Sequence, residues 1–376
     1  MQKSALLISG AGIAGSTLAV LAARAGFDVT VVELAPGLRS SGNPVDVHGA
    51  AFDVVDRLNI AERLRAFATH TRELVFVDDT GTPQARLAIN GAVDSRHIEI
   101  ARTDLSAVLS HAGRDDYELL WSDHITALRD RSPAPGIEVE FASSPPRVFD
   151  VVVGADGLHS GVRTLAFGEE DEFVKFLALY VATLQLNEAA ADPTQVVMHN
   201  DPGVSLSLHP GTGKPMAAFI FRSEQRLPYR DSDAKLELLR QAYARSGWRA
   251  AELLDSFASS GDLYFDAVSQ VRMDSWSVGA VGLVGDAASS LSLFGDGSSS
   301  AIVGAATLAN ELASAKGADR DWAAALQQYE RTHRRVIAPN LRGFALSARL
   351  LVPRTSAGIS IRNAALRGAA RLRPRR

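Results

Sequence analysis

The sequence predicts an α/β fold built on a parallel sheet, with a second, mainly antiparallel sheet inserted into it. Three short apolar runs carry the first half of this prediction, because each ends in a cluster of glycine and acidic residues. They span residues 5–8, 148–154 and 280–285. Short runs that are apolar throughout are typical of strands buried on both faces of a parallel sheet. Since ligands of open α/β sheets bind at the carboxyl ends of the strands, the three clusters are expected to meet at one ligand.

The first apolar run opens a βαβ unit. Gly10, Gly12 and Gly15 follow it as GxGxxG, a helical pattern continues from there, and a second buried strand ends at Glu33. The first glycine permits the turn, the second admits a pyrophosphate, and the third packs helix against strand. The positive helix end attracts phosphate, and the acid is placed to accept hydrogen bonds from both ribose hydroxyls. The unit therefore predicts a tightly bound dinucleotide other than NADP, whose 2′-phosphate Glu33 would repel.

The inserted sheet is predicted from strand-like runs, such as residues 74–77 and 216–221, that Gly and Pro punctuate. A helical pattern follows over 232–256, and a long amphipathic helix over 321–351 is expected to break near Pro339. The predicted division is a discontinuous nucleotide-binding domain of residues 1–72, 99–170 and 271–320, a substrate domain of 73–98 and 171–270, and a C-terminal helical segment of 321–376 with a basic tail.

Composition excludes several classes of function. The 376 residues carry a net charge of −4, which provides no field for nucleic acid, and 46% of them are hydrophobic, as in a globular protein. The chain has no cysteine, which excludes thiolate catalysis and cysteine-bound metals and is compatible with the cytoplasm. The N-terminal run enters a glycine turn instead of a cleavage site, and the run 176–184 is too short to span a bilayer. We therefore expect no signal peptide and no integral membrane segment.

Two further features have unremarkable interpretations. The arginine-rich C-terminus, from Arg362 onward, is predicted to be a solvated, frayed tail. The histidines are too scattered in the sequence to predict a metal site, and no catalytic triad is evident; those considered are His97, His111, His159, His199, His209 and His333.

Motifs in the second and third strand-end clusters resemble a known flavoprotein family. Residues 151–163, VVVGADGLHSGVR, are similar to the DG motif of the aromatic-hydroxylase, or para-hydroxybenzoate-hydroxylase-like, group A FAD-dependent monooxygenases. Residues 282–288, GLVGDAA, resemble the GD motif of that family, and the two follow GxGxxG in the family's order across nearly the whole chain. Residues 42–48 and 100–105 are also similar to its tetracycline-inactivating branch.

This resemblance implies a Rossmann-like FAD-binding domain of the GR2 type and a flavin that carries the chemistry. NADPH or NADH would reduce FAD transiently, molecular oxygen would add at the flavin C4a position, and the hydroperoxide would hydroxylate a small molecule. Two alternatives remain open at this point: a reductase or oxidase of the same fold, and a catalytically silent flavoprotein that sequesters a ligand.

The resemblance also implies which residues contact the cofactor. Asp286 is expected at the ribityl and pyrophosphate part of FAD, Arg102 along the same chain, and Asp156 and Gly157 at the dinucleotide. The full set expected to contact the cofactor comprises Gly10, Gly12, Ile13, Ala14, Gly15, Glu33, Leu34, Arg39, Asp46, Arg102, Asp156, Gly157, Gly285, Asp286, Gly295, Gly297, Ser298 and Ser299.

The chain departs from the family pattern after the GD motif. Ser289 to Phe294 replace the usual histidine and prolines, and Ser299 stands where the family has asparagine. The loop still ends in glycines that open a helix, whose positive end is expected to stabilise negative charge on the reduced flavin.

A substrate pocket is expected between the flavin and the inserted sheet. Arg222 would steer a phenolate or carboxylate there, and the apolar walls favour a small aromatic or polyketide-like substrate bound by a monomer or homodimer. Plain core packing is the competing interpretation of the same stripe. The expected pocket residues are Gln185, Leu206, Leu208, Phe219, Phe221, Arg222 and Phe294.

Overall fold

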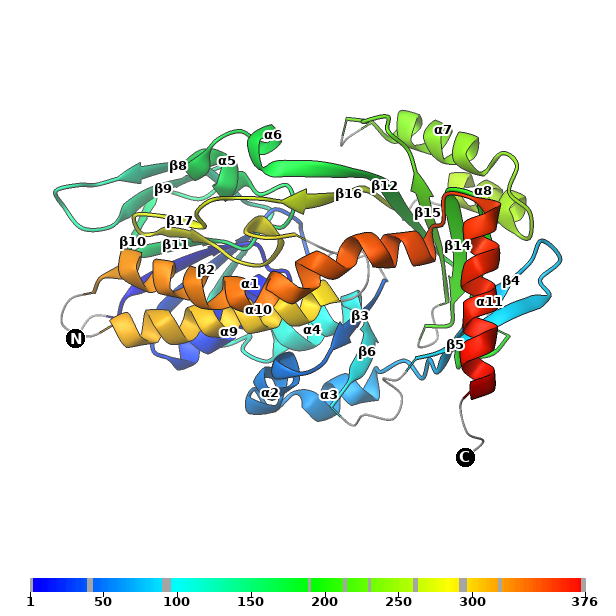
Figure 1. The fold of residues 1–376 in the computed structure, drawn as a ribbon. Coiled ribbons are helices and arrows are strands. Elements are labelled where there is room, and N and C mark those ends of the chain that lie inside the picture. Colours follow the sequence, from blue (N-terminus) through cyan, green and yellow to red (C-terminus); the bar gives the residue numbers. More distant parts are fainter. Residues whose placement is uncertain are drawn as a thin grey trace.

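The computed structural model describes residues 3–38, 43–89, 96–188, 191–211, 215–228, 231–259, 263–290, 296–316 and 320–372. Two sheets lie side by side and one long helix crosses from the first to the second (Figure 1). The predicted α/β class, with an inserted sheet and a long C-terminal helix, is confirmed.

The first sheet has six strands in the order β17-β18-β11-β1-β2-β7. All neighbours pair in parallel except β17 and β18. The three apolar runs of the sequence are adjacent strands here, so the clusters that follow them meet at one edge of the sheet. The strands are β1 (Ala5–Ser9), β2 (Asp28–Glu33), β7 (Glu118–Trp121), β11 (Val151–Gly154), β17 (Ser277–Val278) and β18 (Val281–Leu283).

Helices cover one face of the six-stranded sheet. Helix α1 packs against α9, and α9 packs against α10, so an apolar core forms that includes Leu18, Ile302 and Leu326. These and the neighbouring helices are α1 (Ile13–Arg24), α2 (Ala50–Arg57), α3 (Ala61–Ala66), α4 (Arg102–His111), α9 (Asp296–Ala315) and α10 (Trp322–Leu351).

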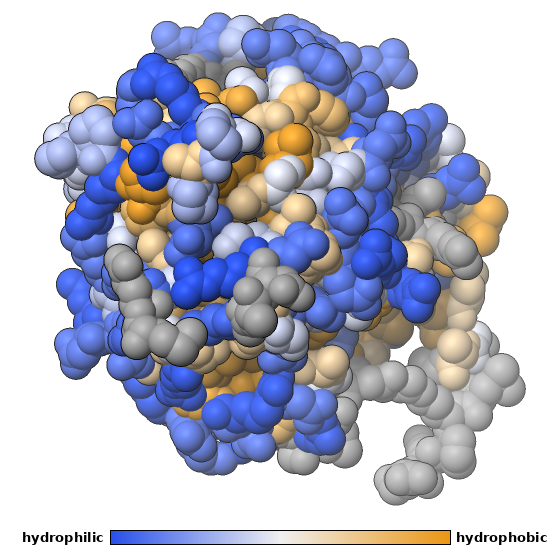
Figure 2. Space-filling view, turned by 90° about the vertical axis from the view of Figure 1, so that its left-hand side faces the viewer, coloured by the Kyte–Doolittle hydropathy of each residue, from blue (hydrophilic) through white to orange (hydrophobic). Residues whose placement is uncertain are grey.

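Smaller elements surround the six-stranded sheet. A three-stranded meander and the short helix α5 lie beside it, and an antiparallel ribbon of β3 and β6 extends toward the second sheet (Figure 1). The end of the molecule that carries the meander has a mostly hydrophilic surface with apolar patches between (Figure 2). The bounds are β3 (Pro44–Val47), β6 (Ile98–Ala101), β8 (Ile125–Asp130), β9 (Ile137–Phe141), β10 (Arg147–Phe149), α5 (Gly161–Phe167), α6 (Glu170–Phe173) and the 3-10 turn η2 (Gly285–Ala287).

The second sheet has seven strands in the order β16-β12-β15-β14-β13-β4-β5. It is antiparallel except where β13 pairs with β4, which comes from a separate part of the chain. The strands are β4 (Glu73–Val77), β5 (Pro83–Ala88), β12 (Val174–Gln185), β13 (Gln195–Asp201), β14 (Val204–His209), β15 (Met216–Arg222) and β16 (Leu263–Val271).

Helices α7 (Ser232–Tyr243) and α8 (Ala250–Ser259) cover one face of the seven-stranded sheet. Asp231 caps α7, because its carboxylate accepts a hydrogen bond from the Ala234 amide at 3.0 Å. Leu238, Leu239 and Tyr243 of α7 are buried against the strands. This face therefore has an apolar core of its own.

The long C-terminal helix does not break as the sequence predicted. Helix α10 runs from Trp322 to Leu351 with Pro339 inside it, and Asp321 caps its start by accepting from the Ala324 amide at 2.9 Å. A proline removes one helical hydrogen bond. Packing against α9 at one end and against the seven-stranded sheet at the other keeps the helix continuous across that position.

The arginine-rich C-terminus is also not a frayed tail over the residues that the structure describes. It forms helix α11 (Ser356–Leu372), which packs on β5 and β13. Arg362 is only 7% exposed, and its Nη1 donates to the Asn200 Oδ1 at 2.7 Å and the Leu350 carbonyl at 2.9 Å. Its guanidinium lies 3.8 Å from the centre of the Phe76 ring, and burial lowers its pKa to about 10. The arginine thus anchors the helix, a role that charge patterning did not reveal.

Candidate functional site

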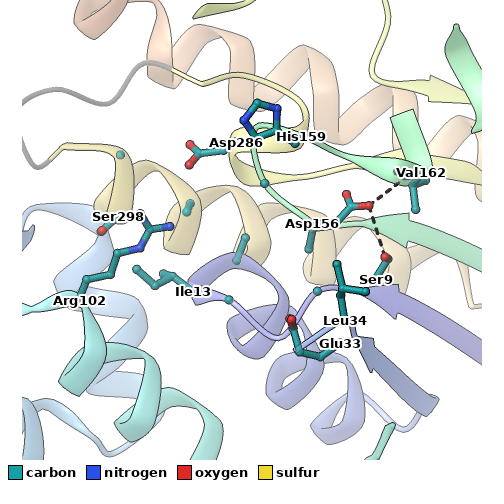
Figure 3. A pocket seen from close by; sticks show the side chains of 18 of the residues that line it. Ser9, Ile13, Glu33, Leu34, Arg102, Asp156, His159, Val162, Asp286 and Ser298 are labelled. Atoms are coloured by element: carbon teal, nitrogen blue, oxygen red, sulfur yellow. Dashed lines mark hydrogen bonds between the residues drawn. The ribbon is translucent and has the colours of Figure 1, made fainter. Parts of the chain in front are cut away.

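A cavity of about 600 Å³ lies at the carboxyl ends of β1, β2 and β11. It extends from the six-stranded sheet to Val181 and Tyr264 of the seven-stranded sheet. Its polar side chains come from several segments and point toward a common space (Figure 3). The predicted convergence of the strand-end clusters is observed here, since Gly12, Asp156 and Asp286 all line this cavity.

The glycines of the first turn have distinct geometric roles. A Cβ on Gly10, whose φ is +103°, would lie 2.6 Å from the Ala155 carbonyl oxygen, and one on Gly15 would lie 1.9 Å from that of Gly10. Gly12 lines the cavity, and a Cβ there would meet nothing within 4 Å. Gly10 and Gly15 therefore allow the backbone to pack closely. Gly12 leaves an open cradle at the start of α1, which suits a phosphate.

Glu33 ends β2 beside this turn. One carboxylate oxygen accepts a hydrogen bond from the Ala11 amide at 2.8 Å, and the other accepts from the Ala35 amide at 2.9 Å. A carboxylate has about four lone-pair positions. Two therefore remain for hydroxyl donors from a ligand.

Asp156 organises the turn after β11. Its carboxylate accepts hydrogen bonds from the Ser160 hydroxyl, from the Val162 amide at 3.0 Å and from the Ser9 hydroxyl at 3.4 Å. Burial raises the pKa of this carboxyl against the opposing effect of the hydrogen bonds. Asp156 therefore binds β1 to the start of α5, in addition to facing the cavity.

Arg163 joins the second strand-end cluster to the third, and sequence analysis did not single it out. Its side chain is fully buried, and it donates to the carbonyls of Ala287 at 3.1 Å and Leu158 at 2.6 Å. Glu170 provides a charge partner at 3.5 Å. The arginine that closes the VVVGADGLHSGVR segment was thus visible in the sequence, but its partner carbonyls depend on the third dimension.

Asp286 follows β18 and lies across the cavity from the first turn (Figure 3). Burial raises its pKa, and the positive charge of Arg102 opposes that effect. Gly297 and Ser298, in the first turn of α9, line the same end of the cavity. This end therefore combines an arginine with the positive end of a 20-residue helix, a suitable environment for negative charge.

His159 connects the two sheets at the cavity wall. Its Nδ1 lies 3.0 Å from a Glu170 carboxylate oxygen, and its Nε2 lies 3.7 Å from Asp266 on β16. Burial acts to lower the pKa of His159, but Asp266 and Glu170 outweigh it and the pKa is raised. The contact fixes β16 against the loop after β11.

A second, smaller cavity of about 40 Å³ adjoins the first and shares Pro44 with it. The β3–β6 ribbon and the seven-stranded sheet both contribute to its walls. Glu99 is its half-buried acid, and desolvation raises the pKa of that carboxyl although the Thr69 hydroxyl donates to it. Gln185, His209 and Met216 of the seven-stranded sheet also line it.

Comparison with known proteins shows the family of this chain. The model of a protein family described as "FAD binding domain" matches residues 3–343. A flavin-dependent monooxygenase of Legionella longbeachae is 30% identical over 318 residues, which cover 83% of this chain and 81% of that protein. An uncharacterized protein of Mycobacterium tuberculosis is 38% identical over 318 residues, covering 82% and 85% of the two chains. The crystal structure of the tetracycline destructase Tet(51) superposes with a TM-score of 0.83 at 28% identity, covering 98% of this chain and 96% of that one.

The chain belongs to the FAD-dependent monooxygenase family.

The expected family, enzyme class and cofactor are thereby confirmed. FAD in this family takes electrons from NAD(P)H and uses them to activate molecular oxygen. The residues present fit that cofactor, since Gly12 leaves an open cradle, Glu33 keeps free acceptor positions, and the cavity is long enough to reach both sheets. No helix in the described part of this monooxygenase is long and apolar enough to cross a membrane.

Most of the predicted cofactor residues line the large cavity. They are Gly10, Gly12, Ile13, Ala14, Glu33, Leu34, Arg102, Asp156, Gly157, Asp286, Gly297 and Ser298. Gly15 and Gly285 pack against neighbouring backbone and Ala14 instead. Arg39 and Gly295 lie outside the described residues.

Asp46 and Ser299 form a contact beside the cavity. The Asp46 carboxylate lies 2.7 Å from His97 Nε2, and the Ser299 hydroxyl donates to the Asp46 carbonyl at 2.7 Å. Ser299 also accepts from the His48 amide at 3.1 Å. The serine at the family's asparagine position thus holds strand β3 to the start of α9.

The predicted substrate residues fall on two different faces of the seven-stranded sheet. Leu206, Phe219 and Phe221 are fully buried in the core under α7 and α8, and Leu208 packs against that core. Gln185 lines the small cavity on the opposite face. Arg222 donates to the carbonyls of Val352 at 3.0 Å and Ala348 at 2.9 Å, so it holds the end of α10. Phe294 lies outside the described residues.

Several cavity residues gave no signal in the sequence. Asp123 accepts hydrogen bonds from the amides of His124, Ser143 and Ser144, each at 2.9 Å, and thereby shapes the loop after β7. Val181 and Tyr264 reach the cavity because alternate residues of β12 and β16 face it. The alternation of side chains along these strands is visible in the sequence. It shows which face of the sheet lines the cavity only once the arrangement of the two sheets is known.

Proposed function

We propose that this monooxygenase hydroxylates a small aromatic or polyketide-like molecule held between FAD and the seven-stranded sheet. One observation carries the proposal: the large cavity is lined by Val181 and Tyr264, and the small cavity, which holds Glu99 and Gln185, adjoins it on the same face of the sheet. A substrate ring at this junction would lie where the two sheets meet, and a polar substituent would enter the small cavity.

The relatives support this class of substrate. The structural neighbour Tet(51) is a tetracycline destructase by name, and its likeness extends over 98% of the present chain. Tetracyclines are fused-ring polyketides with several hydroxyl and amide groups. Glu99 and Gln185 offer acceptor and donor groups of the matching kind in the small cavity.

In the proposed arrangement, different residues of the large cavity hold different parts of FAD. Gly12 and the start of α1 hold the pyrophosphate, Glu33 accepts from the adenosine ribose, and Asp286 with Arg102 holds the ribityl end. The first turn of α9 would lie near the flavin ring, and its positive end would favour negative charge there. We also propose domain boundaries at residues 72, 98, 170, 270 and 320, and the cytoplasm as the location, since the reductant NAD(P)H is found there.

The experiment that tests the function uses purified protein loaded with FAD. NAD(P)H oxidation is measured with a panel of aromatic and polyketide compounds, and products are analysed by mass spectrometry under ¹⁸O₂. We expect a substrate to accelerate NAD(P)H oxidation and to gain one oxygen atom labelled from the gas. Label from water, or oxidation of substrate without mass gain, would contradict the proposal.

A matched pair of variants locates the cofactor. Gly12→Val fills the open cradle with a branched side chain and is expected to abolish FAD retention and activity together. Gly37→Val alters a glycine that likewise has open space around a Cβ but does not line the cavity, so it should retain FAD. Equal FAD content in the two variants would argue against the phosphate position.

A further inference from the structure

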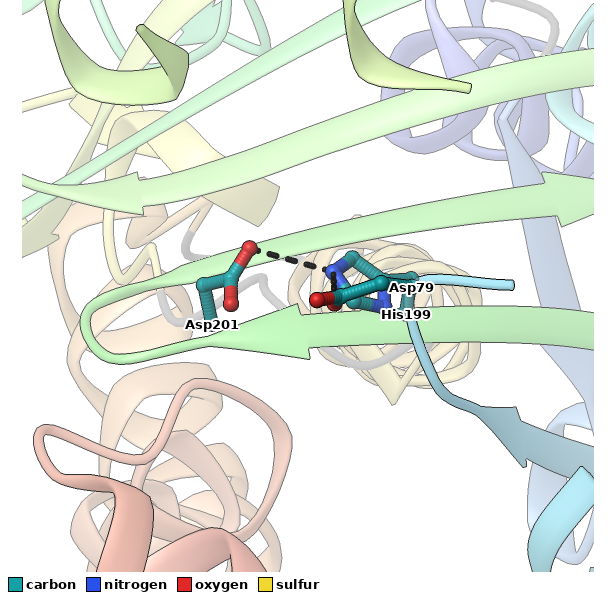
Figure 4. Close-up of side chains that lie close together, drawn as sticks. All are labelled: Asp79, His199 and Asp201. Carbon is teal, nitrogen blue, oxygen red and sulfur yellow. Dashed lines mark hydrogen bonds and ion pairs between the residues drawn. The ribbon is translucent and has the colours of Figure 1, made fainter. Parts of the chain in front are cut away.

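Three ligand-type side chains meet at the carboxyl ends of the neighbouring strands β13 and β4, and none of them lines either cavity. His199 Nε2 lies 3.0 Å from an Asp201 carboxylate oxygen and 3.5 Å from an Asp79 carboxylate oxygen. The three ligand atoms lie within 4.8 Å of one another. Figure 4 shows the two carboxylates directed at the same imidazole, from the end of β13 and from the turn that follows β4.

The two distances from His199 fit a shared metal ion. Zinc binds histidine nitrogen and carboxylate oxygen at about 2.0–2.2 Å. Two ligand atoms at about 2.1 Å from one ion subtend roughly 90° when they are 3.0 Å apart, and roughly 110° when they are 3.5 Å apart. Both angles are ordinary for four- to six-coordinate divalent ions.

The outer contacts resemble those that orient metal ligands. His199 is 2% exposed, and both ring nitrogens have partners: Nδ1 lies 3.4 Å from the Val77 carbonyl, and Nε2 lies 3.0 Å from the Asp201 carboxylate. A metal ion bound at Nε2 would replace the hydrogen there, and the ring hydrogen would then lie on Nδ1, facing Val77. The Ser246 hydroxyl donates to Asp201 at 2.7 Å, and the Gly247 amide donates to it at 3.4 Å. Although burial acts to raise the pKa of Asp201, these bonds and His199 lower it.

The surrounding loop holds the third ligand in place. The Trp248 amide donates to the Asp79 carbonyl at 3.1 Å, and a Cβ on Gly247 would lie 2.8 Å from the Asp79 carboxyl carbon. The Asp79 side chain is 74% exposed, which leaves an approach from solvent. Across the described residues, neither aspartate forms an ion pair with lysine or arginine. Two carboxylates therefore share a single histidine, and the cluster has excess negative charge.

We propose that Asp79, His199 and Asp201 form a binding site for one divalent transition-metal ion of the zinc type, with water completing the coordination. Mixed nitrogen and oxygen ligands favour such an ion over Mg²⁺ or Ca²⁺, which prefer oxygen alone. The ion joins the β4–β5 turn, strand β13 and the loop between α7 and α8. Its role is structural: it holds these segments together on the helix-covered side of the sheet and takes no part in oxygen chemistry.

The test measures Zn²⁺ binding to FAD-loaded protein that has been freed of metal with EDTA. Titration calorimetry is expected to find one tight Zn²⁺ per chain, and Zn²⁺ is expected to raise the melting temperature. Asp79→Asn removes an exposed ligand without disturbing the core, so it should weaken Zn²⁺ binding at least 10-fold and abolish the rise in melting temperature. Ser246→Ala should weaken binding about 10-fold, as the loss of an orienting contact does.

Matched controls alter the same residue types elsewhere. Asp56 and His111 are exposed, and neither belongs to the cluster, so Asp56→Asn and His111→Asn should bind Zn²⁺ like the wild type. The proposal is wrong if the wild type binds no Zn²⁺, or if Asp79→Asn binds Zn²⁺ as tightly as the wild type does.

A local readout makes the assignment independent of stability. The Trp248 ring centre lies 6.1 Å from that of His199. Paramagnetic Ni²⁺ bound at the cluster should therefore quench Trp248 fluorescence, and the quenching should disappear in Trp248→Phe while calorimetric binding remains. Quenching that persists in Asp79→Asn at the same Ni²⁺ concentration would overturn the proposal.

Discussion

The two faces of the seven-stranded sheet are both buried, yet they differ in chemistry. The face under α7 and α8 carries Leu206, Phe219 and Phe221, while their sequence neighbours Ser207 and Ala218 face the opposite side. On that second face, His209, Met216 and Gln185 line the small cavity. The comparison teaches that the face under α7 and α8 is apolar along its strands, whereas the opposite face is apolar where α10 and α11 pack on it and carries polar side chains such as Gln185 and His209 at the small cavity.

The largest expected effect concerns the helix-covered face. Phe219→Ala removes a ring that packs edge-on against Tyr243 and Phe257, and we expect it to lower the free energy of unfolding by about 3–5 kcal/mol. Denaturant unfolding measures the change. The folded fraction should keep its KM, and Phe219→Leu should lose much less stability. A large rise in KM without loss of stability would instead place Phe219 at the substrate, and the face under α7 and α8 would then be the one that binds it.

The second effect is a pH dependence of stability that arises from His209, on the face of the sheet opposite α7 and α8. Burial lowers the pKa of His209 to about 4, below its ordinary value of 6.5, so the folded state favours the neutral ring. The unfolded chain takes up the proton first, so stability is complete above pH 6.5 and is lost as the pH falls toward 4. The slope is at most about 1.4 kcal/mol per pH unit for each such group.

His333 acts in the same pH window, because burial lowers its pKa to about 4 as well. We therefore expect His209→Gln to reduce the loss of unfolding free energy measured between pH 7 and 4.5, and the double variant with His333→Gln to reduce it further. Groups with a raised pKa, such as His159 and Glu99, act in the opposite direction in both variants. An unchanged slope in His209→Gln would show that its ring is hydrated in the cavity.

A smaller loss of unfolding free energy is expected when a polar contact within the face under α7 and α8 is removed. The Tyr243 hydroxyl donates toward the carbonyls of Ser205 at 2.6 Å and Ile220 at 3.1 Å, and burial raises its pKa far above the ordinary value. Tyr243→Phe should cost about 1–2 kcal/mol of unfolding free energy, since two buried carbonyls lose a donor. Leu236→Ala, at a partly buried position of the same helix, provides a packing reference.

The smallest effect on stability is expected for Gln185→Ala. This exposed side chain of the cavity face donates to the Pro215 carbonyl at 2.7 Å, so its loss should change unfolding by less than about 0.5 kcal/mol. Once a substrate is known, the variant should raise KM severalfold and leave FAD content unchanged. Wild-type kinetics would remove Gln185 from the proposed substrate site.

The cofactor side of the molecule was predictable because its chemistry depends on local sequence. A turn such as Gly10 to Gly15 or Asp156 to Arg163 carries its own backbone requirements, and parallel strands bring the turns to one edge. The sheet side was less predictable. Strand alternation separated Leu206 from Ser207, but both are buried, so hydrophobicity did not tell which one faces the ligand.

The remaining differences between the predictions and the structure arise from contacts between residues that are far apart in the sequence. Arg362 seemed to belong to a basic tail because the sequence does not show Asn200 or Phe76 beside it. His199 seemed isolated for the same reason, since Asp79 is 120 positions away along the chain. The helix over residues 321–351 was expected to break near Pro339, and only the packing at both ends shows why it continues.

Helix α10 restricts how the two sheets can move. Its 30 residues span about 45 Å, with Tyr329 in the core of the six-stranded sheet and Ala348 in contact with the other sheet. It therefore limits how far the two sheets can move relative to each other. If the substrate binds between the sheets as proposed, a substrate too large for that space would require α10 to bend, and bending is easiest at Pro339, where one helical hydrogen bond is missing.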